Sequence, residues 1–271
     1  SIDFLAIYIG PILVLSLGNR LFRRVVQLAK AQNITSIADF VASRYGKSER
    51  VAALVSIIAV VGSVPYIALQ LKAIAGSLTV LILTVDPGAV GRTLPIFGDL
   101  ALFTALILAA FATAFGTRHV DATEHQDGLM LAIAVESLVK LLAFLAVGIF
   151  VTFVMFDGPG DLFGRAAAQI DLTPILDRGA SGTSFLVTTL LSGTIILLLP
   201  RQFHVAVVEN RDEDDTRRAG WMFPLYLVAI NVFVVPLALA GDLLLSPTAD
   251  RDMAVLMLPL QHGAQGLALL A

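Results

Sequence analysis

The sequence predicts an all-α integral membrane protein, and three observations carry that prediction. Of its 271 residues 57% are hydrophobic and 14% are charged, which is far more apolar than a soluble domain of this size. Successive polar loops along the chain are alternately rich and poor in positive charge. The apolar residues gather in six stretches: residues 2–17, 51–85, 100–115, 128–156, 185–199 and 221–240.

Most of these stretches reach or approach the length of a membrane-spanning helix. A hydrocarbon core of about 30 Å needs about 20 mostly apolar residues, with about 17 as the lower limit. Every backbone amide inside hydrocarbon must be bonded internally, so each span is expected to be helical. The chain is therefore expected to form a bundle of about six transmembrane helices.

Loop charge predicts the topology of this bundle. Cytoplasmic loops accumulate Lys and Arg. The first, third and fifth loops hold twelve of these residues, whereas the remaining loops hold four. We expect the first set in the cytoplasm, the N-terminal end outside, and a multi-pass location in the cell inner membrane. Both chain ends look like cuts through a larger protein, so residues 1–271 are expected to be one transmembrane domain truncated at both ends.

The polar segment after the first stretch carries the signals of a short interfacial helix. Thr35 or Ser36 offers an N-cap, apolar residues follow at helical spacing, and Gly46 provides a stop. The second stretch, residues 51–85, is too long for one crossing and contains a Gly and Pro65. This combination predicts a tilted or kinked helix.

The fifth stretch carries helix breakers. Ser192, Gly193 and Thr194 are followed by Pro200. Irregular backbone at membrane depth is tolerated only where it is buried in protein or lines a cavity. This pattern indicates a discontinuous helix.

Three ionisable residues lie inside predicted spans: Lys72, Glu136 and Lys140. Each costs roughly 2.5–3.5 kcal/mol on insertion scales, so each is expected to face protein or water. Glu136 and Lys140 are four residues apart in the order that favours an ion pair. One interpretation is a self-neutralising structural pair, and the other is a proton or substrate relay.

The composition argues against several other functions. The chain has no Cys, and its net charge of −3 is too small to indicate a polyanionic partner such as nucleic acid. No glycine-rich phosphate loop, metal-binding motif or catalytic triad is present, so no metal, cofactor or enzyme activity is expected of this chain.

Three motifs resemble the sodium/solute symporter family. Residues 34–46, ITSIADFVASRYG, resemble its signature of the form T-x-x-D-F-x-x-x-R-(F/Y)-G, and residues 66–71, YIALQL, resemble its Y-I-A-x-Q-L. Residues 200–204, PRQFH, with residues 210–212, are similar to the Q-P-H stretch that closes a later helix. Residues 60–74, 118–124 and 200–205 are most similar to the symporter-like N-terminal input domain of bacterial sensor histidine kinases.

The resemblance implies a fold and a function. It implies a partial LeuT-type inverted-repeat bundle, in which this chain supplies the second to seventh of ten core helices. Such a domain would bind and translocate a small polar solute, such as histidine or another amino acid, by alternating access coupled to Na⁺ or H⁺. It would act as the input module of a histidine kinase with a response regulator as partner, and the alternative is a stand-alone symporter without a signalling role.

The resemblance also implies candidate substrate-binding residues. By approximate position on the third core helix these are Tyr66 and Gln70, and on the sixth core helix Ser192 and Thr194. The family's coupling-ion site uses the first and eighth core helices, so no complete sodium site is expected within residues 1–271.

Overall fold

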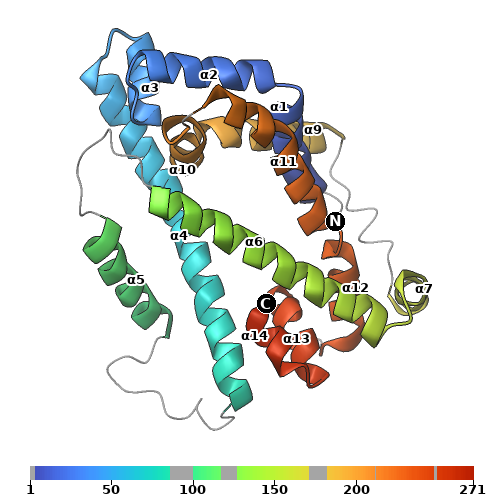
Figure 1. Ribbon diagram of the computed structural model, residues 1–271. Coiled ribbons are helices and arrows are strands. Elements are labelled where there is room, and N and C mark those ends of the chain that lie inside the picture. Colours follow the sequence, from blue (N-terminus) through green and yellow to red (C-terminus); the bar gives the residue numbers. More distant parts are fainter. Residues whose placement is uncertain (1–3, 86–99, 117–126, 171–181, 211, 247–248) are drawn as a thin grey trace.

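The computed structural model describes residues 4–85, 100–116, 127–170, 182–210, 212–246 and 249–271, and these residues form helices without a strand (Figure 1). The loop motif at residues 118–124 lies outside the described residues. In chain order the elements are α1 (Phe4–Ser16), α2 (Asn19–Ala31), α3 (Ile37–Arg44), α4 (Glu49–Val85), α5 (Leu100–Gly116), α6 (Asp127–Phe150), η2 (Val151–Met155), α7 (Pro159–Gln169), α9 (Gly182–Leu198), α10 (Pro200–Phe203), η3 (His204–Val208), α11 (Glu213–Asn231), α12 (Val234–Leu244), η4 (Arg251–Met253), α13 (Ala254–Gln261) and α14 (Gln265–Leu270).

The expectation of a helical membrane protein is confirmed, whereas six full spans are not found among the described residues. Three segments of the described chain are long and apolar enough to cross a bilayer: Glu49–Ile82, Met130–Met155 and Asp214–Leu244. Two bent pairs raise the number to five if each is one span, namely α1 with α2 and α9 with α10 and η3. The third predicted stretch forms only the shorter apolar helix Leu100–Ala114.

The predicted short helix after the first stretch is α3, and its caps follow the sequence signals. Ser36, not Thr35, is the N-cap, and its hydroxyl accepts a hydrogen bond from the Asp39 amide at 3.1 Å. Gly46 follows the helix with φ +68°, a conformation in which a Cβ is unfavourable. The Phe40 ring of α3 packs on Phe203 of α10 with centroids 5.4 Å apart, so α3 supports the half-helix that follows the break in the fifth stretch.

Helix α2 was not predicted from the sequence. It bends 70° away from α1 and buries Phe22, Val26 and Ala29, which recur at helical spacing, while Arg20 and Arg24 are exposed. Its apolar periodicity was present in the sequence, but the many positive charges of this segment made it resemble a polar loop.

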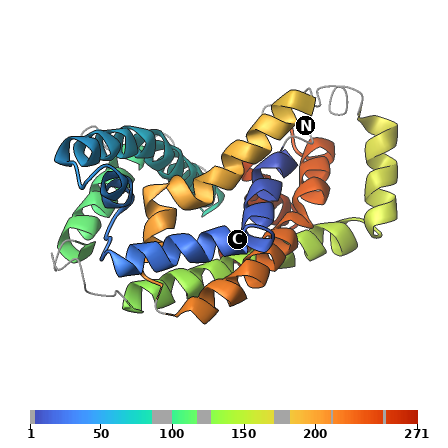
Figure 2. The ribbon, with the colours of Figure 1, turned by 90° about the horizontal axis from the view of Figure 1, so that it is seen from above.

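Helix α4 is continuous from Glu49 to Val85 through Pro65. At 1.5 Å per residue its 37 residues extend about 55 Å, well beyond the hydrocarbon core, so the stretch is too long for one perpendicular crossing, and its tilt stays a prediction. With α5 it lies at one edge of the molecule, and α7 lies at the opposite edge (Figures 1 and 2).

Two clusters of buried apolar residues form the core of the described chain. One joins η2, α7, α12 and α13 around Val151, Leu162 and Leu258, which are fully buried. The other joins α1, α2, α9, α10 and η3, with Val26, Phe203 and Val207 at most 1% exposed. The second cluster therefore fixes the chain on both sides of the break after α9.

Helices α1 and α9 approach each other closely in this second region. A Cβ placed on Gly10 would lie 2.1 Å from Ser192 Oγ and 2.3 Å from the Thr189 carbonyl oxygen. The Ser192 hydroxyl donates to the Ala6 carbonyl at 2.8 Å across the same contact. Small residues are used in this way where two membrane helices must pack backbone to backbone.

We expect Gly10→Ala to destabilise the protein by about 1–3 kcal/mol, because the added methyl group meets backbone atoms of α9 that cannot rotate away. Gly62→Ala in α4 is the matched control, since a Cβ there meets no atom within 4 Å. Thermal unfolding of the purified protein in detergent should show a lower midpoint for the Gly10 variant only. Equal midpoints for both variants would contradict the close contact.

Candidate functional site

The predicted discontinuous helix is present, and its break is at Leu199. Helix α9 ends at Leu198 and α10 begins at Pro200, with a bend of 53° between the two segments. Leu199 has φ −68° and ψ 132°, the extended conformation favoured before a proline. Pro200 occupies the first turn of α10, where its missing N–H leaves no intrahelical bond unmade.

A π-helical turn, η3, follows α10 directly. The Glu209 amide donates to the His204 carbonyl at 2.9 Å, which closes this turn. The wider turn also brings the two side chains together, with His204 Nε2 3.2 Å from Glu209 Oε1. The Glu209 side chain is 5% exposed, so a carboxylate is buried at the end of the half-helix. Isolated π turns of this kind are frequent at functional sites.

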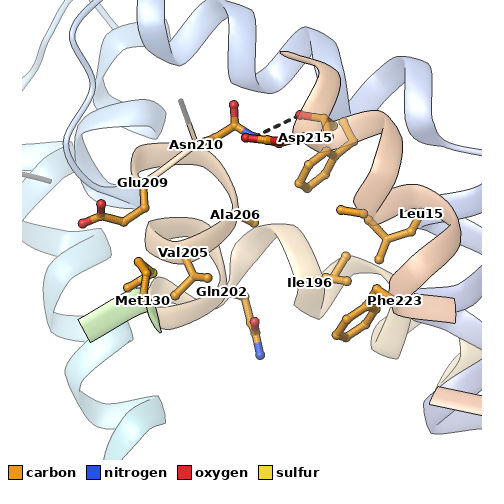
Figure 3. Close-up of a pocket in the computed structure, with 13 residues that line it drawn as sticks. Leu15, Met130, Ile196, Gln202, Val205, Ala206, Glu209, Asn210, Asp215 and Phe223 are labelled. Carbon is orange, nitrogen blue, oxygen red and sulfur yellow. Dashed lines mark hydrogen bonds between the residues drawn. The ribbon is translucent and has the colours of Figure 1, made fainter. Parts of the chain in front are cut away.

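A pocket of about 410 Å³ lies beside the half-helix (Figure 3). Its apolar side includes Leu15, Ile196 and Phe223, while Asn210 and Asp215 lie together at one end. The full lining consists of Leu15, Phe22, Met130, Ile196, Gln202, Val205, Ala206, Glu209, Asn210, Asp215, Thr216, Ala219 and Phe223. This lining contains two carboxylates and no basic side chain, so it favours a solute with a positive or hydrogen-donating group.

Asn210 organises the polar end of the pocket. Its Nδ2 donates to the hydroxyl of Thr216, which is 2% exposed, at 3.1 Å, and its Oδ1 accepts from Lys30 Nζ at 3.2 Å. One side chain thus joins α2 and α11 to the segment that follows η3. These bonds hold the pocket wall in position without using the lining carboxylates.

The four candidate substrate-binding residues are described in the structure, and none of them lines this pocket. Ser192 is buried and donates to Ala6 and Thr189 carbonyl oxygens, whereas Thr194 is exposed and donates to the Leu191 carbonyl. Tyr66 and Gln70 are exposed on α4.

Tyr66 has a partner that sequence reasoning did not identify. Its hydroxyl accepts a hydrogen bond from Arg201 Nη1 at 3.2 Å, which joins the middle of α4 to the start of α10. Arg201 also lies within electrostatic range of the Glu136 carboxylate on α6. An Arg directly after a helix-breaking Pro in an apolar stretch was the available signal, because such a charge requires a partner.

The predicted pair of Glu136 and Lys140 forms on α6. Both side chains are more than half exposed on the surface of the chain, at 59% and 66%. Lys72 on α4 is exposed too, and among the described residues it has no hydrogen-bonding or ion-pair partner. Glu136 therefore interacts with both Lys140 and Arg201, whereas Lys72 has no such partner among the described residues.

Comparisons of the chain with protein-family models, with curated proteins and with solved structures give no match. Among the described residues, no group of three or more His, Asp or Glu side chains is arranged to hold a metal ion.

We expect Glu136→Gln to lower the free energy of unfolding by about 1–2 kcal/mol, because Lys140 then lacks its counter-charge inside a span. The effect should be smaller than the roughly 3–5 kcal/mol typical of a fully buried pair, since both side chains are partly exposed. Thermal unfolding in detergent measures it. Recovery of the unfolding midpoint in the double variant Glu136→Gln, Lys140→Leu would support a structural pair. A double variant that recovers stability but does not recover transport would indicate a relay.

Proposed function

We propose that this chain forms part of a membrane domain that binds and translocates a small polar solute by alternating access, coupled to Na⁺ or H⁺. The observation that carries the proposal is a helix broken at Leu199 within a candidate span, with a pocket of about 410 Å³ against its second half. Secondary transporters bind their substrates at discontinuous helices, where freed backbone groups and half-helix ends face the solute.

The pocket suits a small solute in size and chemistry. Small-molecule sites commonly measure about 300–1,000 Å³ and combine apolar walls with a few placed polar groups. Gln202 of α10, with Asn210 and Asp215, supplies such groups against the apolar side formed by Leu15 and Phe223. Loop charge assigns the ends of α2 and α11 that surround this pocket to the cytoplasm, so we propose an inward-facing site.

Two biological roles are compatible with this proposal. In the first, which the resemblance favours, solute binding or flux in a LeuT-type bundle biases a downstream histidine kinase. In the second, the domain is a sodium/solute symporter alone. Gradient-driven accumulation of amino acids by proteoliposomes that contain the full-length protein tests the transport step common to both. Saturable binding without accumulation would instead indicate a receptor.

We expect Ala206→Phe to reduce solute binding and uptake at least tenfold, because the added ring fills part of the pocket that Ala206 lines. Ala112→Phe is the matched control, since it adds the same ring to an exposed position on α5. Equilibrium binding and initial uptake rates of a labelled amino acid provide the measurement. Unchanged values in the Ala206 variant would remove this pocket from the transport route.

A further inference from the structure

Arg201 is a charged side chain at the break of a candidate membrane span, and most of its donors are unused. A guanidinium has five N–H groups arranged as a fork. The structure gives Arg201 one hydrogen bond, from Nη1 to the Tyr66 hydroxyl at 3.2 Å. Within the part of the chain that the structure describes, no carboxylate lies within ion-pair distance of it.

The surrounding charges leave this region positive. Glu136 is the acid that Arg201 influences electrostatically, but the Glu136 carboxylate is bonded to Lys140. Two cations therefore share one anion at the junction of α4, α6 and α10. A net positive charge favours an incoming anion.

Tyr66 makes this position specific for an acceptor group. Its oxygen receives the Arg201 hydrogen bond, so its own O–H proton remains available to donate. Arg201 and Tyr66 come from different helices and together present several N–H groups and one O–H. A carboxylate, with two oxygens and about four lone-pair sites, accepts bonds from both partners at once.

We propose that Arg201 and Tyr66 form a subsite for a carboxylate, and hence that the transported or sensed solute is a carboxylic acid. The inference rests on the proposed function for the presence of a solute at the break, and it adds the chemical class of that solute. The subsite lies on the side of α10 that faces α4, whereas the next residue, Gln202, lines the pocket. Neither Arg201 nor Tyr66 lines the pocket, so the proposed carboxylate subsite is a neighbour of the pocket and not part of its lining.

A purely structural role for Arg201 makes a different prediction. If Arg201 only ties α10 to α4, its replacement would weaken the binding of every solute or the folding of the protein, without regard to the solute's charge. A carboxylate subsite instead predicts a change in the preference between an acid and its neutral analogue. The ratio of two affinities on one variant separates these cases, since a general structural effect cancels in the ratio.

The test uses the full-length protein in lipid nanodiscs and a panel of carboxylic acids, each paired with its amide. The panel contains the L-amino acids and their α-amides, with lactate and lactamide as a pair without an amino group. Binding is measured at equilibrium for the wild type, Arg201→Lys, Arg201→Gln and Tyr66→Phe. Arg217→Gln is the matched control, because it removes an exposed Arg of α11 with the same change in net charge.

We expect at least one acid to bind at least tenfold more tightly than its amide. Arg201→Gln should abolish that preference, Arg201→Lys should retain part of it, and Tyr66→Phe should reduce it. Arg217→Gln should leave it unchanged. A single sharp elution peak in size-exclusion chromatography for each variant shows that the protein is folded. If Arg201→Gln does not fold, Arg201→Lys still tests the proposal.

Two results would overturn the carboxylate subsite. The first is a panel in which no acid binds, or in which amides bind as tightly as acids. The second is an acid preference that survives Arg201→Gln. Accumulation of a neutral solute would retain the transport proposal and exclude the subsite. An acid preference that depends on Arg201, without accumulation under any gradient, would retain the subsite and exclude transport.

Discussion

The contact of α1 with α9 at Gly10 and Ser192 is the constraint on which the arrangement of the site depends. Backbone-to-backbone packing leaves no room for a side chain at Gly10 and uses the Ser192 hydroxyl as a bond to Ala6. It thereby fixes the end of α9, and the apolar cluster around Phe203 and Val207 fixes the half-helix that follows. The direction of the chain at Leu199 is set between these two supports.

The break at Leu199 gives consecutive residues of α10 different surroundings. Successive residues of a helix are about 100° apart, so Arg201 faces α4 while Gln202 lines the pocket. If the helix were uninterrupted, the axis of α9 would determine the directions of both side chains. After the 53° bend, the guanidinium of Arg201 bonds the Tyr66 hydroxyl, whereas the amide side chain of Gln202 lines the pocket.

Much of the secondary structure and the charge pairing followed from local rules. The N-cap at Ser36, the helix break before Pro200 and the pair of Glu136 with Lys140 all depend on residues within a few positions of one another. Hydrogen bonds of caps, the missing N–H of proline and the spacing of a helical turn determine them. Helix α2 was not among them, because its positive charges made the segment resemble a polar loop although its apolar periodicity is present in the sequence.

The sequence by itself determined a helical membrane protein with a broken fifth stretch, because apolar length, helix breakers and loop charge are properties of the chain alone. The tertiary structure decided which polar groups meet. It directed Ser192 into a helix contact and Thr194 outward, and it joined Tyr66 to Arg201 across 135 residues of chain. Periodicity describes the face of one helix, whereas such a contact also depends on how two helices pack and bend.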